Sequence, residues 1–199
     1  MIASKDVKIK IPDEFTSEYI ENELKKEQYR HRYRRVLRST FFSLLVVAAI
    51  AVLIAVLVLP VIQIVGTSMT DTLWDGDIVV ALSGSSYDTG DIVAFYYNNS
   101  ILIKRVIARA GDWIDIDEEG NVSVNDTLLS EPYVTDKAFG ECDIELPYQV
   151  PDGKWFVMGD HRETSIDSRN TAIGCIGDDM MVGRLVLRVW PLSEFGVIN

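Results

Sequence analysis

The sequence predicts a mainly β fold: a domain of antiparallel β-sheet behind one N-terminal transmembrane helix. Three observations carry this prediction. An uncharged apolar run fills residues 41–62, a basic stretch precedes it, and short β-branched and aromatic runs bounded by turn residues follow it. We therefore expect a cytoplasmic segment over residues 1–39, a transmembrane helix over 40–62 and an extracytoplasmic β-rich domain over 63–199.

The apolar run is long enough to cross a membrane. Ser43 is its only polar residue before Pro60. As a helix it would reach ~33 Å at ~1.5 Å per residue, against a hydrocarbon core of ~30 Å. A cleavable signal peptide has a shorter apolar region, followed by a small-residue cleavage site. A buried core helix is the alternative, but the length and the flanking charge favour a membrane anchor.

The stretch before the apolar run is strongly basic. Residues 25–38 contain seven Lys and Arg against one acidic residue, Glu27. By itself such a stretch is also typical of a solvated helix face or of a patch that contacts anionic lipid. Basic residues that flank a membrane span tend to stay in the cytoplasm. We therefore expect a single-pass protein of the cell membrane, with a cytoplasmic N-terminus and the C-terminal domain outside.

Charge and composition exclude two classes of site. The net charge of −11 divides into +3 for residues 1–39 and −14 for residues 60–199. A domain this acidic is a poor candidate for nucleic-acid binding, which needs clustered positive charge. Two cysteines and two histidines are too few for a zinc framework, so we expect neither a metal nor a cofactor. Whether Cys142 and Cys175 form a disulfide stays open.

The residue pattern after the apolar run indicates short antiparallel strands. Gly-Asp pairs recur beside the β-branched and aromatic runs, at residues 76–77, 90–91, 111–112 and 159–160. Glycine and aspartate are turn residues, and strands at this spacing are typical of all-β domains. We expect the stretch from Asp117 to Leu129 to form an extension that contains a β-hairpin.

Lys104 lies within a predicted strand over residues 100–108. Alternate strand residues share a face, so its side chain would project beside Leu102 and Val106. Burial there would lower the lysine pKa toward neutrality, as a general base requires. The alternative is a strand lysine whose stem covers apolar surface while its amine reaches water.

Ser68, after the span, is a candidate nucleophile that needs a base to take its proton. His31 precedes the span, which leaves His161 as the histidine available for a Ser-His-Asp triad. His161 lies in a polar run, residues 159–169, that follows an apolar strand. That run is either a loop held by Asp–Arg pairs or a shell that positions a base. From the residues alone, a histidine base and a lysine base both remain open.

Three motifs resemble, in order, those of bacterial type I signal peptidases. They are Gly66-Thr67-Ser68-Met69, Lys104-Arg105-Val106-Ile107 and the run from Gly159 to Arg169. Each motif is modestly specific, but three in order behind a basic-flanked anchor are jointly specific. The resemblance extends from the apolar run to the end of the chain. It implies the Gram-positive-like, single-span form of the family and an antiparallel β fold with a Ser/Lys dyad.

Carried over by position, the resemblance assigns the reacting groups. It implies Ser68 as the nucleophile and Lys104 as a neutral general base. It also implies that Ser165 forms a hydrogen bond with the lysine nitrogen and orients it. The supporting ion pairs that it implies are Asp167 with Arg169 and Asp160 with Arg105.

The resemblance also assigns the oxyanion site and the groove. The Ser68 N–H would donate to the oxyanion, which is often the largest electrostatic contribution in acyl transfer. Met69 would line the substrate groove, and Gly66 stands where some branches of the family have a second, hydroxyl donor. Two residues depart from the family pattern. Asp71 replaces a proline, and we expect its carboxylate to point away from Lys104; His161 replaces an asparagine.

The function implied by the resemblance is removal of N-terminal signal peptides from exported preproteins. Its partners would be those signal peptides and the lipid bilayer, with the secretion translocon as a further candidate, and no nucleic acid. Ser68 lies eight residues beyond Pro60, at most ~27 Å along an extended chain, which suits a substrate emerging from the membrane. Two rivals remain: a His161 triad, and a pilus-assembly or export factor of the same fold without catalysis.

Overall fold

The computed structural model describes residues 17–84 and 86–198, so residues 1–16 of the expected cytoplasmic segment 1–39 lie outside the described residues. The chain divides into two compact units, residues 1–52 and 53–199. One long helix, α1, covers Ser17–Val58. The strands are β1 (Val61–Gln63), β2 (Ile78–Leu82), β3 (Ile92–Tyr97), β4 (Ser100–Arg109), β5 (Trp113–Ile116), β6 (Val122–Val124), β7 (Thr127–Leu128), β8 (Tyr148–Gln149), β9 (Lys154–Met158), β10 (Ile176–Gly177), β11 (Met181–Trp190) and β12 (Gly196–Val197), with short 3₁₀ turns η1 (Asp178–Met180) and η2 (Leu192–Glu194).

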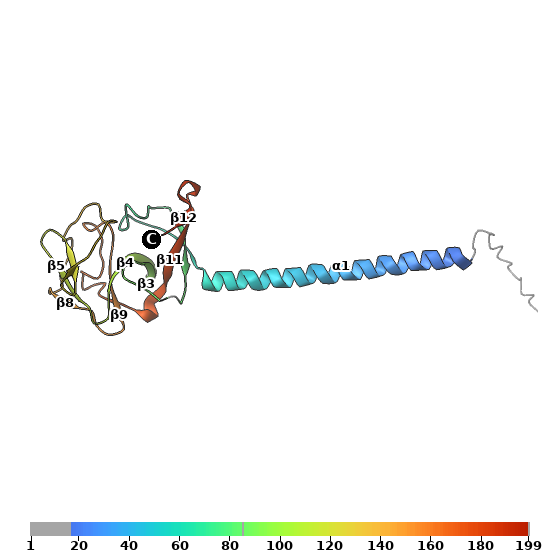
Figure 1. The fold of residues 1–199 in the computed structure, drawn as a ribbon, viewed down its shortest axis with the longest axis horizontal. Helices are drawn as coiled ribbons and strands as arrows, with labels where there is room; N and C mark the ends of the chain where they lie inside the picture. Colours follow the sequence, from blue (N-terminus) through green and yellow to red (C-terminus); the bar gives the residue numbers. More distant parts are fainter. Residues whose placement is uncertain (1–16, 85, 199) are drawn as a thin grey trace, which may run out of the picture. The chain divides into compact units, whose positions relative to one another are not determined.

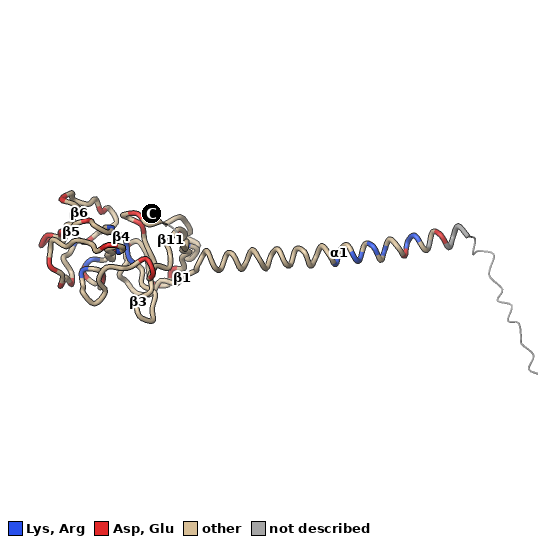
Figure 2. Tube along the Cα trace, turned by 90° about the horizontal axis from the view of Figure 1, so that it is seen from below, with Lys and Arg blue, Asp and Glu red and all other residues tan. Residues whose placement is uncertain are grey.

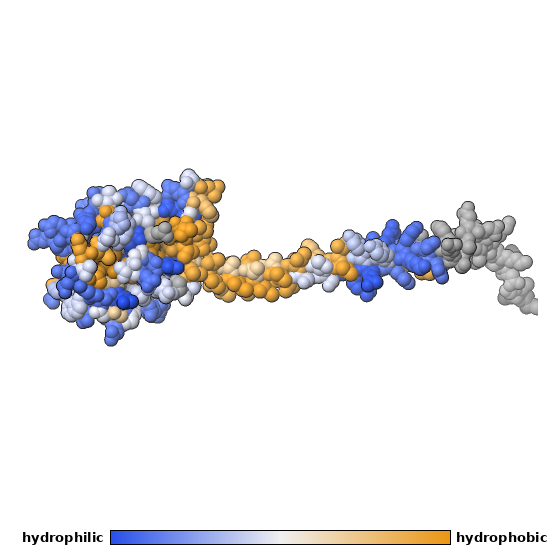
Figure 3. All heavy atoms as spheres, viewed as in Figure 1, coloured by the Kyte–Doolittle hydropathy of each residue, from blue (hydrophilic) through white to orange (hydrophobic). Residues whose placement is uncertain are grey.

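The composition of α1 changes sharply along its length. Lys and Arg gather in its first half (Figure 2), whereas apolar residues cover its second half (Figure 3). The portion Leu24–Val58 is long and apolar enough to cross a membrane, and none of its most apolar window is buried within the protein. Exposed aliphatic side chains on every face of a helix are typical of a lipid-facing segment.

The apolar run is divided between a helix and a strand. We predicted a helix up to residue 62, but α1 ends at Val58, and Val61–Gln63 forms β1. Pro60 explains the break, because it has no N–H to donate and disfavours helical geometry in the residue before it. At its other end α1 is longer than predicted and runs through the basic stretch from Ser17.

The remainder of the chain is antiparallel β-sheet, as predicted (Figure 1). The larger sheet has the order β1-β2-β11-β3-β4-β9-β10, with β12 paired to β11. The smaller sheet has the order β7-β6-β5-β8. Its β6–β7 hairpin turns at Asn125 and Asp126, both with positive φ, and confirms the predicted hairpin within residues 117–129.

Strand β4 organises the larger sheet. It pairs with β3 from Ser100 to Arg105 and with β9 from Arg105 to Arg109. Apolar side chains of β3 and β4 enter three core clusters: Ala94 and Ile103 belong to one, Phe95 and Val106 to a second, and Ile107 of β4 to a third. Because β9 pairs with β4 only from Arg105 onward, the stretch 100–104 keeps one strand edge free. Lys104 stands where that free edge ends.

Candidate active site

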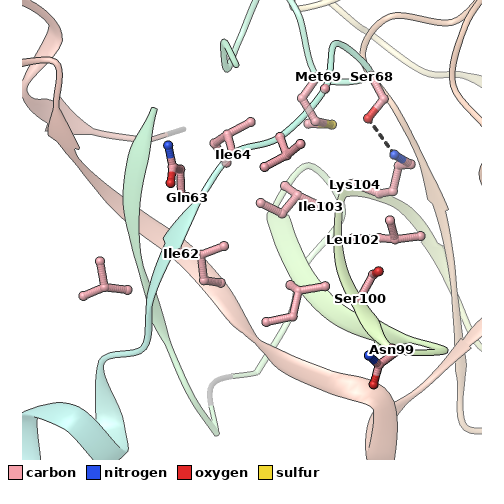
Figure 4. A pocket seen from close by; sticks show the side chains of 14 residues that line it. Ile62, Gln63, Ile64, Ser68, Met69, Asn99, Ser100, Leu102, Ile103 and Lys104 are labelled. Atoms are coloured by element: carbon pink, nitrogen blue, oxygen red, sulfur yellow. Dashed lines mark hydrogen bonds between the residues drawn. The ribbon is translucent and has the colours of Figure 1, made fainter. Parts of the chain in front are cut away.

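Ser68 and Lys104 meet beside the free edge of β4. Lys104 Nζ lies 2.7 Å from Ser68 Oγ, within hydrogen-bond distance, although the residues are 36 positions apart (Figure 4). Ser68 belongs to the loop after β1, and Lys104 pairs across the sheet with Val93. Lys104 is only 3% exposed, so its amine has Ser68 as a neighbour in place of bulk water. A hydroxyl and an amine at this distance can exchange a proton.

The surroundings of Lys104 favour its neutral form. Burial is the dominant cause and lowers the pKa of Lys104 to about 8. The Asp167 carboxylate opposes this change, the Arg169 guanidinium assists it, and Asp160 again opposes it, in decreasing order of effect. Asp167 and Arg169 act on this pKa in opposite directions, and burial, the largest of the causes, determines the direction.

Backbone contacts hold the serine in place. The Ser68 carbonyl accepts a hydrogen bond from the His161 N–H at 3.1 Å. At the start of the loop, the Gly66 N–H donates to Asp75 Oδ1 at 2.8 Å, and Gly66 has a φ of +95°, which favours glycine. Met69 is 2% exposed and packs in the core next to the nucleophile loop. The Gly66 N–H is therefore engaged by a side chain, which makes it a poor second donor to an oxyanion.

Both expected ion pairs are present and buried. Arg169 Nε lies 2.9 Å from Asp167 Oδ1, and Arg105 contacts both carboxylate oxygens of Asp160, at 3.0 and 2.8 Å. Asp160 also accepts a hydrogen bond from Thr72 Oγ1 at 2.6 Å. The Asp160–Arg105 pair therefore contacts the nucleophile loop through Thr72, a residue that the sequence analysis did not identify.

Ser165 departs from the expectation. Its Oγ is buried yet has no hydrogen-bond partner among the described residues, so the expected bond to the Lys104 nitrogen is absent. The side chain lies against Gly159 instead: a Cβ on Gly159 would stand 2.2 Å from Ser165 Oγ and 2.5 Å from the Ser68 carbonyl oxygen. The Ser165 N–H donates to the His161 carbonyl at 3.1 Å. Ser165 is thus a packing neighbour of the nucleophile loop in this structure.

The two residues that depart from the family pattern are engaged elsewhere. His161 Nδ1 lies 2.7 Å from Thr164 Oγ1, and its contact with Ser68 is made by its backbone N–H. The Asp71 carboxylate accepts a hydrogen bond from Thr135 Oγ1 at 2.7 Å. The carboxylates that act on the pKa of Lys104 are Asp167 and Asp160, which agrees with the expectation that Asp71 points away.

A groove of about 600 Å³ begins at Ser68. One wall is formed by residues 61–66 and the other by residues 99–104, with Met69 near the serine. Ile62 and Ile64 from one wall and Ile103 from the other point toward one another, whereas Leu102 projects from β4 on the side of Lys104 (Figure 4). Strand β1 is the outermost strand of its sheet, and β4 has its free edge here. The groove therefore has two unpaired strand edges, which suit an extended peptide.

Sequence reasoning missed a second group of buried charges. Glu131 pairs with Arg162, and Tyr133 lies against Arg105, all close to the run 159–169. Their only signal in the sequence was an acidic and an aromatic residue in a loop. Within residues 17–84 and 86–198, no three His, Cys, Asp or Glu side chains gather as a metal site would require, and Cys142 and Cys175 are both free thiols.

Comparison with known proteins identifies the family. The family model described as "Signal peptidase, peptidase S26" matches residues 37–190. The chain belongs to this family. Signal peptidase IB of Staphylococcus aureus (strain COL) is 36% identical over 152 residues, which cover 66% of this chain and 78% of that protein. The motifs of the signal peptidase family and the β fold around them therefore occur together in this chain.

Two plant peptidases and one solved structure are also similar to this chain. Thylakoidal processing peptidase 1 of Arabidopsis thaliana is 36% identical over 149 residues, covering 66% of this chain but 42% of that protein; a second thylakoidal peptidase is covered to 38%. The chain thus spans less than half the length of these two relatives. A crystal structure of a signal peptidase I from Enterococcus faecalis aligns at 25% identity with a TM-score of 0.44, covering 51% of this chain and 97% of that one.

Proposed function

We propose that this chain is a membrane-anchored serine endopeptidase that removes N-terminal signal peptides from exported preproteins. Ser68 is the nucleophile and Lys104 the general base. The observation that carries the proposal is the contact of 2.7 Å between Lys104 Nζ and Ser68 Oγ, made by a lysine that is 3% exposed. Membership of the signal peptidase family supports the same reaction.

The proposed chemistry needs no group other than this dyad. Neutral Lys104 takes the Ser68 proton as the serine oxygen bonds to the scissile carbonyl carbon. The protonated lysine then gives that proton to the leaving amine as the C–N bond breaks, which leaves an acyl-enzyme on Ser68. Lys104 next takes a proton from water as the water oxygen bonds to the ester carbonyl carbon. The bond from that carbon to Ser68 Oγ then breaks, the protonated lysine returns the proton to Ser68, and the signal peptide leaves with a new carboxyl group. The Ser68 N–H would donate to the oxyanion in both steps.

The groove supports a peptide substrate that binds as an added strand. Its two walls are the outer edge of β1, which pairs only with β2, and the part of β4 before Arg105, where pairing with β9 begins. Backbone pairing supplies affinity, while alternate side chains of the peptide enter the apolar hollow. Met69 and Gly66 lie at the end of the groove beside Ser68, where the residue before the cut would sit.

The proposed location is the cell membrane, with α1 as a single span. Its second half is apolar and its first half basic, which supports a cytoplasmic N-terminus and an extracytoplasmic catalytic domain. On this topology the enzyme meets a signal peptide whose own apolar segment is still in the bilayer. The lipid bilayer and signal peptides are then its partners, and the secretion translocon is a further candidate.

A cleavage assay tests the proposal. The full chain in detergent is incubated with a preprotein, and the N-termini of the products are sequenced. We expect one cut after the signal peptide, abolished in both Ser68→Ala and Lys104→Ala. Loss of cleavage in His161→Ala with retention in Lys104→Ala would favour the histidine triad. If wild-type protein leaves every preprotein intact, a non-catalytic export or pilus-assembly factor becomes the better account.

A further inference from the structure

A buried ion pair outside the dyad joins the connection between β7 and β8 to the loop after β9. Arg162 contacts both carboxylate oxygens of Glu131, at 2.5 and 3.2 Å, and both side chains are fully buried. A buried pair of this kind stabilises a fold only weakly, because desolvation offsets the attraction between the charges. The contacts that Arg162 makes explain its burial better than a gain in stability does.

One of these contacts is made with Gly159. Arg162 Nε donates to the Gly159 carbonyl at 3.1 Å, and the Gly159 N–H donates to Asp167 Oδ2 at 3.0 Å. The Gly159 backbone is thus held through its carbonyl by the Glu131–Arg162 pair and through its N–H by the Asp167–Arg169 pair. Gly159 also lies in close contact with the Ser68 carbonyl. Two residues later, the His161 N–H donates to that same carbonyl.

Tyr133 makes a parallel contact with the other supporting arginine. Its ring centre lies 3.8 Å from the Arg105 guanidinium carbon, a close cation–π contact. Arg105 holds Asp160, and Asp160 accepts the hydrogen bond of Thr72 in the nucleophile loop. The Tyr133 hydroxyl in turn lies 3.4 Å from Glu131 Oε1. Residues 131–133 therefore contact Arg162, which holds the Gly159 carbonyl, and Arg105, whose partner Asp160 holds Thr72.

We propose that Glu131 and Tyr133 are positioning residues of the Ser68–Lys104 dyad, acting through Arg162 and Arg105 respectively. This inference rests on the proposed function for its effect on cleavage. The loop at 159–161 contacts the Ser68 carbonyl from outside any strand, so side chains must set its position. A displacement of the nucleophile by about 1 Å can lower a rate by about 100-fold. Glu131 therefore affects the rate without touching substrate.

Glu131→Gln is the first test, made on the full chain in detergent with a preprotein substrate. We expect kcat to fall at least about tenfold, because the loop loses its anchor. KM should stay within about twofold, because the groove is lined by residues 61–69 and 99–104. Arg184→Gln is the matched control: it removes an arginine from an ion pair, with Asp91 at 3.3 Å, away from the dyad. An unchanged kcat in Glu131→Gln, or an equal loss in the control, overturns the proposal.

A double variant separates positioning from folding. Glu131→Gln alone leaves the Arg162 charge unpaired and destabilises the fold, whereas E131M/R162M replaces both charged side chains by apolar ones of similar length and should recover much of the lost thermal stability. We expect kcat of the double variant to stay low, because methionine has no N–H to replace the Arg162 Nε that donates to the Gly159 carbonyl. Recovery of kcat together with stability would show that the pair is merely structural and would overturn the proposal. Tyr133→Leu, which leaves both charges paired, should also lower kcat at unchanged KM.

Hydrogen exchange gives a readout that needs no activity. The His161 amide should be protected in wild-type protein and should exchange at least about tenfold faster in Glu131→Gln, at a temperature where both are folded. Arg184→Gln should keep the wild-type rate. If wild-type protein cleaves no preprotein but this difference appears, the proposed function fails and the positioning stands. If cleavage is found and exchange at His161 is the same in both proteins, the positioning fails and the function stands.

Discussion

Thr72 Oγ1 donates a hydrogen bond of 2.6 Å to Asp160 Oδ2, which ties the nucleophile loop to the loop after β9 across 88 positions of sequence. Asp160 is 2% exposed and already paired with Arg105. The short polar bond thus belongs to a buried network in which each member fixes the next. Because of this network, we expect a change at Asp160 or Arg105 to affect the loop that carries Ser68.

Thr72→Val keeps the shape of the side chain but removes the donor. We expect it to lower the free energy of unfolding by about 1–2 kcal/mol, because a buried carboxylate oxygen loses a partner. Cleavage should also slow, since the loop that carries Ser68 is less constrained. Thr72→Ser, which keeps the hydroxyl, should restore both. Urea unfolding and initial cleavage rates measure the two effects, and equal behaviour of the two variants would contradict this account.

The pH dependence of cleavage should report Lys104. A base must be neutral, and the pKa of this lysine is lowered to about 8 by burial. The value of kcat/KM should therefore rise with pH through about 8 and fall about tenfold per pH unit below it. A pH–rate profile of the wild-type protein measures this. A limb governed by a pKa near 6.5, as for histidine, would contradict the assignment of the base.

Lys104→Met should stabilise the fold while abolishing cleavage. The folded-state pKa of Lys104 lies below its unfolded value, so the folded state resists protonation and is penalised at low pH. Below pH 8 the penalty is complete, about 3 kcal/mol, and it disappears as the pH rises toward 10.5. The stability difference between the variant and wild type should shrink over that window. Lys154→Met, an exposed lysine, serves as control; unfolding curves at about pH 7 and about pH 10 give the comparison.

Gly159→Ala should damage both packing and activity. The added Cβ would lie 2.2 Å from Ser165 Oγ and 2.5 Å from the Ser68 carbonyl oxygen, too close for either to remain in place. We expect a loss of about 1–3 kcal/mol in stability and a large loss of kcat. Gly196→Ala has nothing within 4 Å of the new Cβ and should be neutral. Wild-type rates in Gly159→Ala would show that the loop moves freely.

Ser165→Ala tests the one site residue whose contact differs from the expectation. Its Oγ is buried without a partner among the described residues, and an unsatisfied buried hydroxyl costs about 1 kcal/mol or more. The variant should therefore be slightly more stable and should keep the pH–rate profile of the wild type. If Ser165 orients the lysine nitrogen, as the resemblance implies, the profile would shift and the rate would fall.

The sequence alone determined the features that depend on neighbours along the chain. Residues 41–58 are apolar on every side, and the helix they predict is present. Short β-branched runs between Gly-Asp turns predicted antiparallel sheet, because pattern and turn residues act locally. The three motifs also predicted the family from sequence alone. The end of the helix was misplaced because the alternation in Val61-Ile62-Gln63 was hidden within the apolar run, although Pro60 marked the break.

Only the tertiary structure decided which side chains meet. The 2.7 Å contact of Lys104 with Ser68 depends on strand register in β4 and on where pairing with β9 begins. Glu131 and Arg162 come together across 31 positions, and Ser165 turns to Gly159 rather than to the lysine. Burial of an amine, and hence its pKa, depends on atoms brought in by distant strands. The local sequence does not determine that packing. The motifs therefore identify the reacting groups, and only the fold determines the distances between them.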